Sequence, residues 1–354
     1  MRFPAAVFAI AASAALRADY VRPAPQRIDI ADGIHVFVSK PYGEVGLDGN
    51  AVAIVSRDGV LVFDSNGTPA ASAAVLAEIR KLTTQPVRYV VNSHWHWDHW
   101  YGTETYTKAF RDVKVVAHEK TRAMMAGPAI EFNRPGLEQQ LPGYIAMLQA
   151  RAASRPELQP ALEEARFFLD QKKRAQLVLP EVTFKDRLDL RLGERRMQVL
   201  HYDRAVTPGD AFLYLPDEKI VVTGDLLVNP VSFALSSYPS GWLRTLEKIE
   251  ALDARVIVPG HGAPLRDKAL LQAHIEVMRI LLQAGKEAPA RGLDADQVRE
   301  EVMPRLRALR ERITGGDAKL NPQFDVYFVD WYLHRVLEEQ NGPLTDAISA
   351  IPPK

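Results

Sequence analysis

The chain contains no cysteine among its 354 residues. This absence excludes disulfides, thiol nucleophiles, iron–sulfur clusters and thiolate metal sites. Any bound metal must therefore be held by histidine, aspartate or glutamate side chains. An excess of one charge is also absent, because 44 basic residues balance 44 acidic ones. Binding of nucleic acid through bulk electrostatics is therefore not expected, although the charge balance does not exclude a local basic patch.

Long apolar runs are scarce, and none after the N-terminus reaches the roughly 20 residues that span a bilayer. The N-terminus has one basic residue, an uncharged alanine-rich stretch over residues 3–16 and small residues at 12–14. This pattern predicts a signal peptide over residues 1–18, with export to the periplasm or the medium. The alternative is a cytoplasmic protein with a frayed N-terminus. We expect no stable membrane insertion.

Hydrophobic residues make up 47% of the chain and charged residues 25%, which is typical of a globular protein. Strand-like and helix-like patterns alternate, which predicts an α/β layered fold. We expect a hairpin over residues 50–64, a helix over 70–82 and strands over 34–38, 87–92 and 113–117. Further strands are expected near 182–184, 188–192, 197–200, 211–215, 219–223 and 255–258, with a helix over 242–252.

Two segments have a mainly helical pattern. Residues 121–176 are rich in Leu, Ala, Arg and Glu, and we interpret them as a helical insertion that is broken by prolines. The chain from residue 266 to 354 is expected to form a helical C-terminal extension. Within it, aromatic residues at helical spacing predict a docking face rather than a ligand platform: Phe324, Tyr327, Phe328, Trp331 and Tyr332.

The run at residues 93–99 is the most informative stretch, because it places three histidines and an aspartate within six residues. Imidazole and carboxylate are the usual zinc ligands of a protein without cysteine. Strand alternation puts His94 and His96 on one side, so that both can reach one metal. Asp98 and His99 fall on the following turn, where they can face a second metal. The interleaved tryptophans either line an apolar pocket or pack beneath this loop.

Two later strands end in a similar way. Asp225 follows an apolar strand in Thr-Gly-Asp-Leu-Leu, and His261 follows another in Val-Pro-Gly-His-Gly. In both, an adjacent glycine lets the backbone turn sharply and bring the polar side chain to the rim. Loops at strand ends are where α/β proteins place their chemistry.

Together these runs give the chain a resemblance to the metallo-β-lactamase superfamily of zinc hydrolases, over roughly residues 25–265. The resemblance implies an αβ/βα sandwich, in which two mixed sheets pack face to face with helices outside. It also implies two metal sites that share Asp225. The residues that carry the resemblance are His94, His96, Asp98, His99, Asp225, His261 and the segment 207–210.

Carried over from the family, the first site contains His94, His96 and Asp225. The second contains Asp98, His99, Asp225 and His261. The family usually has a further first-site histidine directly before the Thr-Pro-Gly-Asp segment, where this chain has Val206. The second site is therefore more complete than the first.

Three interpretations of Val206 stay open. A single zinc occupies the second site, a second metal binds weakly with extra water, or another side chain fills the gap. His201 and Asp203 are the nearest alternatives, although His201 lies five residues upstream at a spacing that points it to the other face. Asp210 is expected to brace the metal-binding loops.

The resemblance implies a hydrolase that binds one or two Zn²⁺ ions. It would use metal-activated water on an ester, thioester, lactone or lactam bond of a small molecule. Asp98 and Asp225 are the expected catalytic residues, because they would ligate the metal and orient the hydroxide. The alternatives are a mononuclear iron oxygenase and a metal-binding relative without enzymatic activity, whose first site has decayed.

Overall fold

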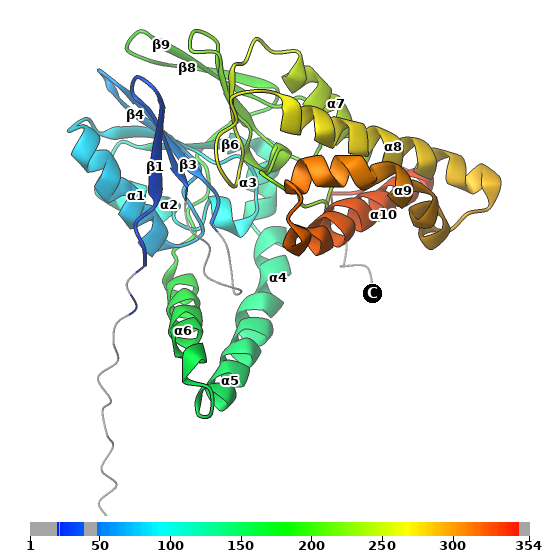
Figure 1. Ribbon diagram of the computed structural model, residues 1–354. Coiled ribbons are helices and arrows are strands. Elements are labelled where there is room, and N and C mark those ends of the chain that lie inside the picture. The colour runs from blue at the N-terminus through cyan, green and yellow to red at the C-terminus, as the bar shows by residue number, and fades with distance from the viewer. Residues whose placement is uncertain (1–19, 21, 39–47, 347–354) are drawn as a thin grey trace, which may run out of the picture.

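The N-terminal half of the chain forms a seven-stranded sheet in this computed structural model, which describes residues 20, 22–38 and 48–346 (Figure 1). The strands lie in sequence order: β1 (Gln26–Ala31), β2 (Ile34–Val38), β3 (Ala51–Ser56), β4 (Gly59–Phe63), β5 (Val87–Val91), β6 (Lys114–His118) and β7 (Val182–Phe184). The first four strands pair antiparallel and the last three continue the sheet in parallel. The expected signal peptide over residues 1–18 lies outside the described residues.

The second sheet has five strands in the order β12-β11-β10-β9-β8. Their bounds are β8 (Arg187–Leu192), β9 (Arg195–Leu200), β10 (Phe212–Leu215), β11 (Ile220–Val222) and β12 (Val256–Val258). Side chains from both sheets fill one apolar core between them, including Val52, Val91, Leu213 and Val258. The two sheets therefore pack face to face.

Helices cover the outer face of each sheet. On the first sheet, α1 (Pro69–Leu82) and α2 (Thr103–Ala109) bury Val75, Ile79 and Tyr106 against β3, β4 and β5. On the second, α7 (Pro239–Glu250) buries Trp242 and Leu246. The predicted αβ/βα sandwich is confirmed. Strand β1 was not predicted, although Ile28 and Ile30 alternate with Arg27 and Asp29 as in an edge strand with one buried face.

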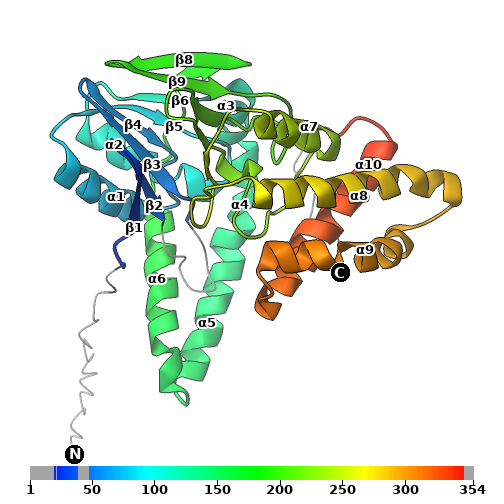
Figure 2. The ribbon, with the colours of Figure 1, turned by 45° about the horizontal axis from the view of Figure 1, so that its top comes forward.

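The insertion between β6 and β7 begins with α3 (Glu119–Met125) and continues as α4 (Pro128–Pro135), the π-helical turn η2 (Gly136–Gln140) and α5 (Leu141–Ala152). A short turn, η3 (Pro156–Leu158), leads into α6 (Gln159–Arg174). Helices α5 and α6 lie side by side as an arm that projects from the sandwich (Figures 1 and 2). The prolines lie mostly where a helix tolerates them: Pro128 and Pro142 are in the first turns of α4 and α5, and Pro135 ends α4 directly before the π-helical turn.

The C-terminal segment consists of α8 (Ala269–Arg291), α9 (Ala295–Thr314), the turn η5 (Ala318–Leu320), the π-helical segment η6 (Gln323–Asp330) and α10 (Trp331–Gln340). Its apolar residues belong to the same cluster as Phe212 of β10 and Trp242 of α7. These helices therefore share a core with the outer face of the second sheet.

The aromatic stripe is only partly a docking face. Phe324, Phe328 and Tyr332 are fully buried, whereas Tyr327 is 41% exposed and contacts Trp331. The reason is the π-helical segment, whose wider turn keeps residues four apart on one face and rotates the intervening residues away.

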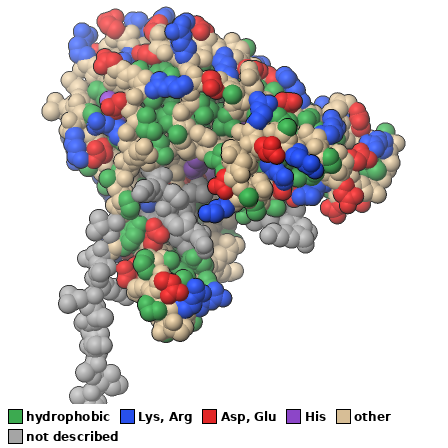
Figure 3. All heavy atoms as spheres, viewed as in Figure 1, with side chains coloured by type: hydrophobic (Ala, Val, Ile, Leu, Met, Phe, Trp, Pro, Cys, Tyr) green, Lys and Arg blue, Asp and Glu red, His purple; other side chains and the backbone are tan. Residues whose placement is uncertain are grey.

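The described part of the chain contains no helix that is both long enough and apolar enough to cross a bilayer. On the face shown in Figure 3, basic and acidic side chains are interspersed over the sandwich and the C-terminal helices.

We predict that Phe328→Ala lowers the free energy of unfolding by about 3–5 kcal/mol, because it leaves a cavity beside Trp242 and Tyr332. The adjacent Tyr327→Ala serves as the control and should cost less than about 1 kcal/mol, because its ring is largely exposed. Urea unfolding of both variants at equal metal content measures the difference. Equal losses would contradict the assignment of the buried face.

Candidate metal centre

The polar strand ends meet at one end of the sandwich. His94, His96, Asp98 and His99 follow β5 of the first sheet, the last two in the 3₁₀ turn η1 (Trp97–His99). Asp225 follows β11 in the 3₁₀ turn η4 (Gly224–Leu226), and His261 follows β12 of the second sheet. All six side chains singled out from the sequence are therefore brought together by the packing of one sheet on the other.

The six side chains form two groups of potential metal donors. His94, His96 and Asp225 make the first, and Asp98, His99 and His261 make the second; within each, the donor atoms lie within 4.8 Å of one another. In the first group, Asp225 Oδ2 lies 3.6 Å from His94 Nε2 and 3.9 Å from His96 Nδ1. In the second, His261 Nε2 lies 3.1 Å from Asp98 Oδ2, which is 3.4 Å from His99 Nε2.

Asp225 belongs to both groups through its two oxygens. While Oδ2 faces the first group, Oδ1 lies 3.2 Å from His99 Nε2 and 3.4 Å from His261 Nε2. The backbone makes room for this carboxylate, because a Cβ on Gly260 would collide with Asp225 Oδ1. Gly224 has φ +53°, a left-handed conformation that turns the chain directly after β11.

These distances fit divalent metal binding. Two ligands that each lie about 2.1 Å from one tetrahedral zinc ion are separated by roughly 3.4 Å, within the range of the distances between donors. Three donor atoms, His94 Nε2, His99 Nε2 and Asp225 Oδ1, are also buried without a hydrogen-bond partner. Buried polar atoms are normally satisfied, so these three are placed to bind an ion.

The surroundings set the charge of these side chains. Burial and the neighbouring imidazoles lower the pKa of His94 to about 3, so its ring is neutral at neutral pH, as metal ligation requires. Burial alone would lower the pKa of His261, but the carboxylates of Asp225 and Asp98 raise it to about 10. Burial also opposes ionisation of Asp98, yet His99 and His261 hold its pKa well below the usual value. The second group therefore favours a bound positive charge, so protons and a metal ion compete for the same donor atoms.

Asp64, a residue that the sequence analysis did not select, holds His99 in place. Its Oδ2 lies 2.8 Å from His99 Nδ1, and both side chains are buried. The carboxylate also accepts hydrogen bonds from the backbone and hydroxyl of Ser93. This contact directs His99 Nε2 toward Asp98 and Asp225. The signal in the sequence was the place of Asp64 directly after apolar β4. Its unusual φ of +60° is visible only in the structure.

Two further contacts hold the ligand loops. The Ser93 hydroxyl lies 2.8 Å from His94 Nδ1, so the other ring nitrogen of His94 faces Asp225. Asn50, at the start of β3, donates to the carbonyls of Pro259 and Gly262 on either side of His261. The first sheet is thereby tied to the ligand loop of the second.

Neither Val206 nor its nearest alternatives, His201 and Asp203, belongs to the donor groups found among the described residues. Val206 is buried in the apolar cluster that contains Trp242. His201 stacks on His118 and its Nδ1 bonds to the Asp210 carbonyl, so it lies outside both donor groups. Asp203 pairs with Arg244 instead. Among the described residues, the donors of the first group are therefore His94, His96 and Asp225.

Asp210 closes its own turn, because its buried Oδ2 accepts a hydrogen bond from the backbone of Thr207. Its expected bracing of the metal-binding loops stays a prediction. Of the tryptophans in the ligand loop, two pack beneath it and one lines a cavity, so both predicted roles occur. Trp95 and Trp100 are buried beneath the ligand loop, and the Trp100 indole donates to the Trp95 carbonyl. Trp97 is partly exposed and lines a cavity.

We predict that Asp64→Asn weakens metal binding by the second group by about 10–100-fold, because an amide cannot satisfy both Ser93 and His99. Isothermal titration calorimetry with Zn²⁺ on the metal-free protein measures the affinity. Asp217→Asn, which removes an exposed carboxylate paired with Arg196, is the control and should bind as the unaltered chain does. Unchanged affinity in Asp64→Asn would show that this contact does not prepare the site.

Comparison with known proteins agrees with this geometry. The family model of the metallo-beta-lactamase superfamily matches residues 45–261, which is more than half of the chain. The linear primary-alkylsulfatase of Pseudomonas sp. (strain ATCC 19151) is 23% identical over 270 residues. That match covers 70% of this chain and 49% of the relative, so the chain spans about half the length of this curated relative.

Solved structures share the fold. A metallo-beta-lactamase from Pontibacter korlensis is 19% identical with a TM-score of 0.52, and the match covers 72% of this chain and 99% of that protein. The DIM-1 metallo-beta-lactamase exposed to ceftazidime is 16% identical with a TM-score of 0.51, covering 72% and 95%. With the family model, the sandwich and the two donor groups in agreement, this chain belongs to the metallo-beta-lactamase superfamily.

Proposed function

We propose that this chain is a zinc-dependent hydrolase that adds water across an ester-type bond of a small molecule. The observation that carries the proposal is the buried carboxylate of Asp225, whose two oxygens face two separate groups of donors. Membership of a superfamily of metal-dependent hydrolases supports the reaction class.

A bound zinc ion would supply a water whose pKa is lowered from about 15.7 to about 7, and would polarise the bond under attack. The chain's own residues would hold and orient that water. Asp98 and Asp225 are the charged oxygen donors of the site. Both oxygens of Asp225 face donor groups, whereas Asp98 faces His99 and His261 through Oδ2 alone, so its other oxygen could accept the water's proton. The four histidines would bind as neutral ligands, so the two carboxylates would balance the charge of one Zn²⁺ ion and half the charge of two.

The two donor groups differ in completeness. The second has Asp98, His99 and His261 together with Asp225, whereas Val206 leaves the first with His94, His96 and the shared Asp225. We therefore propose that the second group binds metal more tightly, and that a metal in the first group keeps additional water.

Candidate scissile bonds are carboxylic esters, thioesters, lactones, lactams and sulfate esters. The sulfate ester is the first to test, because the curated relative is named for linear primary alkyl sulfates. The solved structures named for β-lactam hydrolysis are below 20% identity and support the fold alone. Purified, zinc-loaded protein should hydrolyse at least one of these bond types, and a chelator should abolish turnover.

Metal analysis combined with this panel separates the alternative functions. Zinc with hydrolysis supports the proposal. Iron with oxygen consumption would instead indicate an oxygenase, and tightly bound metal without turnover on any bond type would indicate a binding protein.

We predict a characteristic pattern of metal loss in three variants. Asp225→Ala should lose metal from both groups, because its carboxylate is shared, whereas His261→Ala should weaken the second group and His96→Ala the first. All three should reduce kcat by at least about 100-fold. Metal content by mass spectrometry and calorimetry measures the pattern, with Asp217→Ala as the surface control. Loss of only one of the two metals in Asp225→Ala would contradict the proposal that both groups share this carboxylate.

A further inference from the structure

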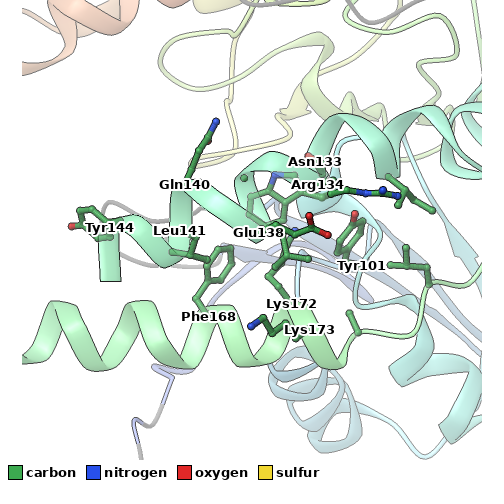
Figure 4. Close-up of a pocket in the computed structure, with 16 residues that line it drawn as sticks. Tyr101, Asn133, Arg134, Glu138, Gln140, Leu141, Tyr144, Phe168, Lys172 and Lys173 are labelled. Carbon is green, nitrogen blue, oxygen red and sulfur yellow. The ribbon is translucent and has the colours of Figure 1, made fainter. Parts of the chain in front are cut away.

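A cavity of about 690 Å³ lies beside the ligand loop. It lies between α6 and the segment that runs from α4 through η2 into α5 (Figure 4). Apolar side chains of the arm line it, including Leu141, Tyr144 and Phe168. The donor residues of the metal groups are not among its lining residues, so this cavity is a separate feature of the molecule.

The cavity contains a lysine in an unusual setting. The Lys172 ammonium lies 3.7 Å from the centre of the Trp97 ring and 3.9 Å from that of Tyr101. Over residues 20, 22–38 and 48–346, Lys172 has no hydrogen-bond or ion-pair partner. Lysines elsewhere in the chain do pair, as Lys108 does with Glu104 and Lys120 with Asp346. Two aromatic faces thus hold this cation while its three N–H donors stay available for an acceptor.

Burial makes the charge of the Lys172 ammonium costly unless an anion binds beside it. Loss of hydration lowers the pKa of Lys172 well below its usual value, and the more distant carboxylates of Asp98 and Asp48 offset this only in part. Arg134 and Lys173 also line the cavity, against a single lining carboxylate, Glu138. The cavity therefore has a net positive lining.

Trp97 connects this lysine to the metal centre. It lies between the donor residues His96 and Asp98 in the chain, and its ring packs both on the arm and on the buried residues beneath the ligand loop. An anion on Lys172 would thus lie at the end of the cavity that adjoins the metal groups, with the apolar lining extending away along α5 and α6.

We propose that Lys172 is a specificity-determining residue that binds the anionic group of an amphiphilic substrate, whose apolar chain occupies the cavity of the arm. The inference rests on the proposed hydrolase function and deepens it by naming the substrate class. The helical insertion is then the element that recognises substrate, and sulfate, sulfonate or carboxylate at one end of an aliphatic chain fits its lining.

Binding of a non-hydrolysable probe tests this inference apart from catalysis. Octanesulfonate, below its micellar concentration, should bind the metal-free and the zinc-loaded protein about tenfold or more tightly than octanol of the same chain length. Lys172→Met should remove this preference in both forms while octanol binding stays unchanged, because methionine keeps the apolar packing on Trp97 and Tyr101. Lys172→Arg should largely restore it.

Lys248→Met is the matched control, because Lys248 also lies over an aromatic ring, that of Tyr202, but outside the cavity. It should bind octanesulfonate as the unaltered chain does. Retention of the preference for octanesulfonate in Lys172→Met, or equal binding of both probes by the unaltered protein, would overturn the inference.

Kinetics distinguish failure of this inference from failure of the proposed function. On whichever bond type is hydrolysed, Lys172→Met should raise KM for an anionic substrate about tenfold or more and leave a neutral one unchanged. Hydrolysis that continues with no such difference overturns the role of Lys172 alone. Lys172-dependent binding of octanesulfonate without hydrolysis of any substrate overturns the function and leaves the anion site standing.

Discussion

The shared carboxylate of Asp225 is the interaction on which the rest of the site depends. Its two oxygens face imidazoles from a loop of the first sheet and from a loop of the second, in a buried environment. Such a carboxylate is stable only where positive charge surrounds it, either as protonated imidazole or as metal. The two sheets must therefore pack so that β5, β11 and β12 end at the same place. The apolar core between them fixes that arrangement.

The surroundings of the site are built to keep that geometry. Asp64 orients His99, and Asn50 ties the His261 loop to the first sheet. On its exposed side the site adjoins Trp97, through which the ligand loop is packed against the projecting arm. Rigid elements thus position the donors, and the helical insertion packs beside the ligand loop through Trp97. A superfamily fold used for different chemistry can vary its substrates in this way without altering the metal groups.

Much of the site could be predicted because its donors are local in sequence or directly follow apolar strands. His94, His96, Asp98 and His99 fall within one loop, and Asp225 and His261 each sit beside a glycine at a strand end. Asp64 could not be recognised in this way, because its role depends on a contact with a histidine 35 positions away. The surroundings of Val206 also needed the fold, which places it in the apolar cluster that contains Trp242.

The sequence by itself determined the class of the fold, the order of most elements and the chemical types of the donors, since these follow from apolar periodicity and from the absence of cysteine. Tertiary structure decided which donors lie in one group, how Asp225 divides its oxygens between the two groups and which side chains pack on the ligand loop. It also placed Lys172 on Trp97 and Tyr101, although Lys172 and Trp97 are 75 positions apart in the chain. Such pairings arise from the packing of distant segments, so local residue patterns do not predict them.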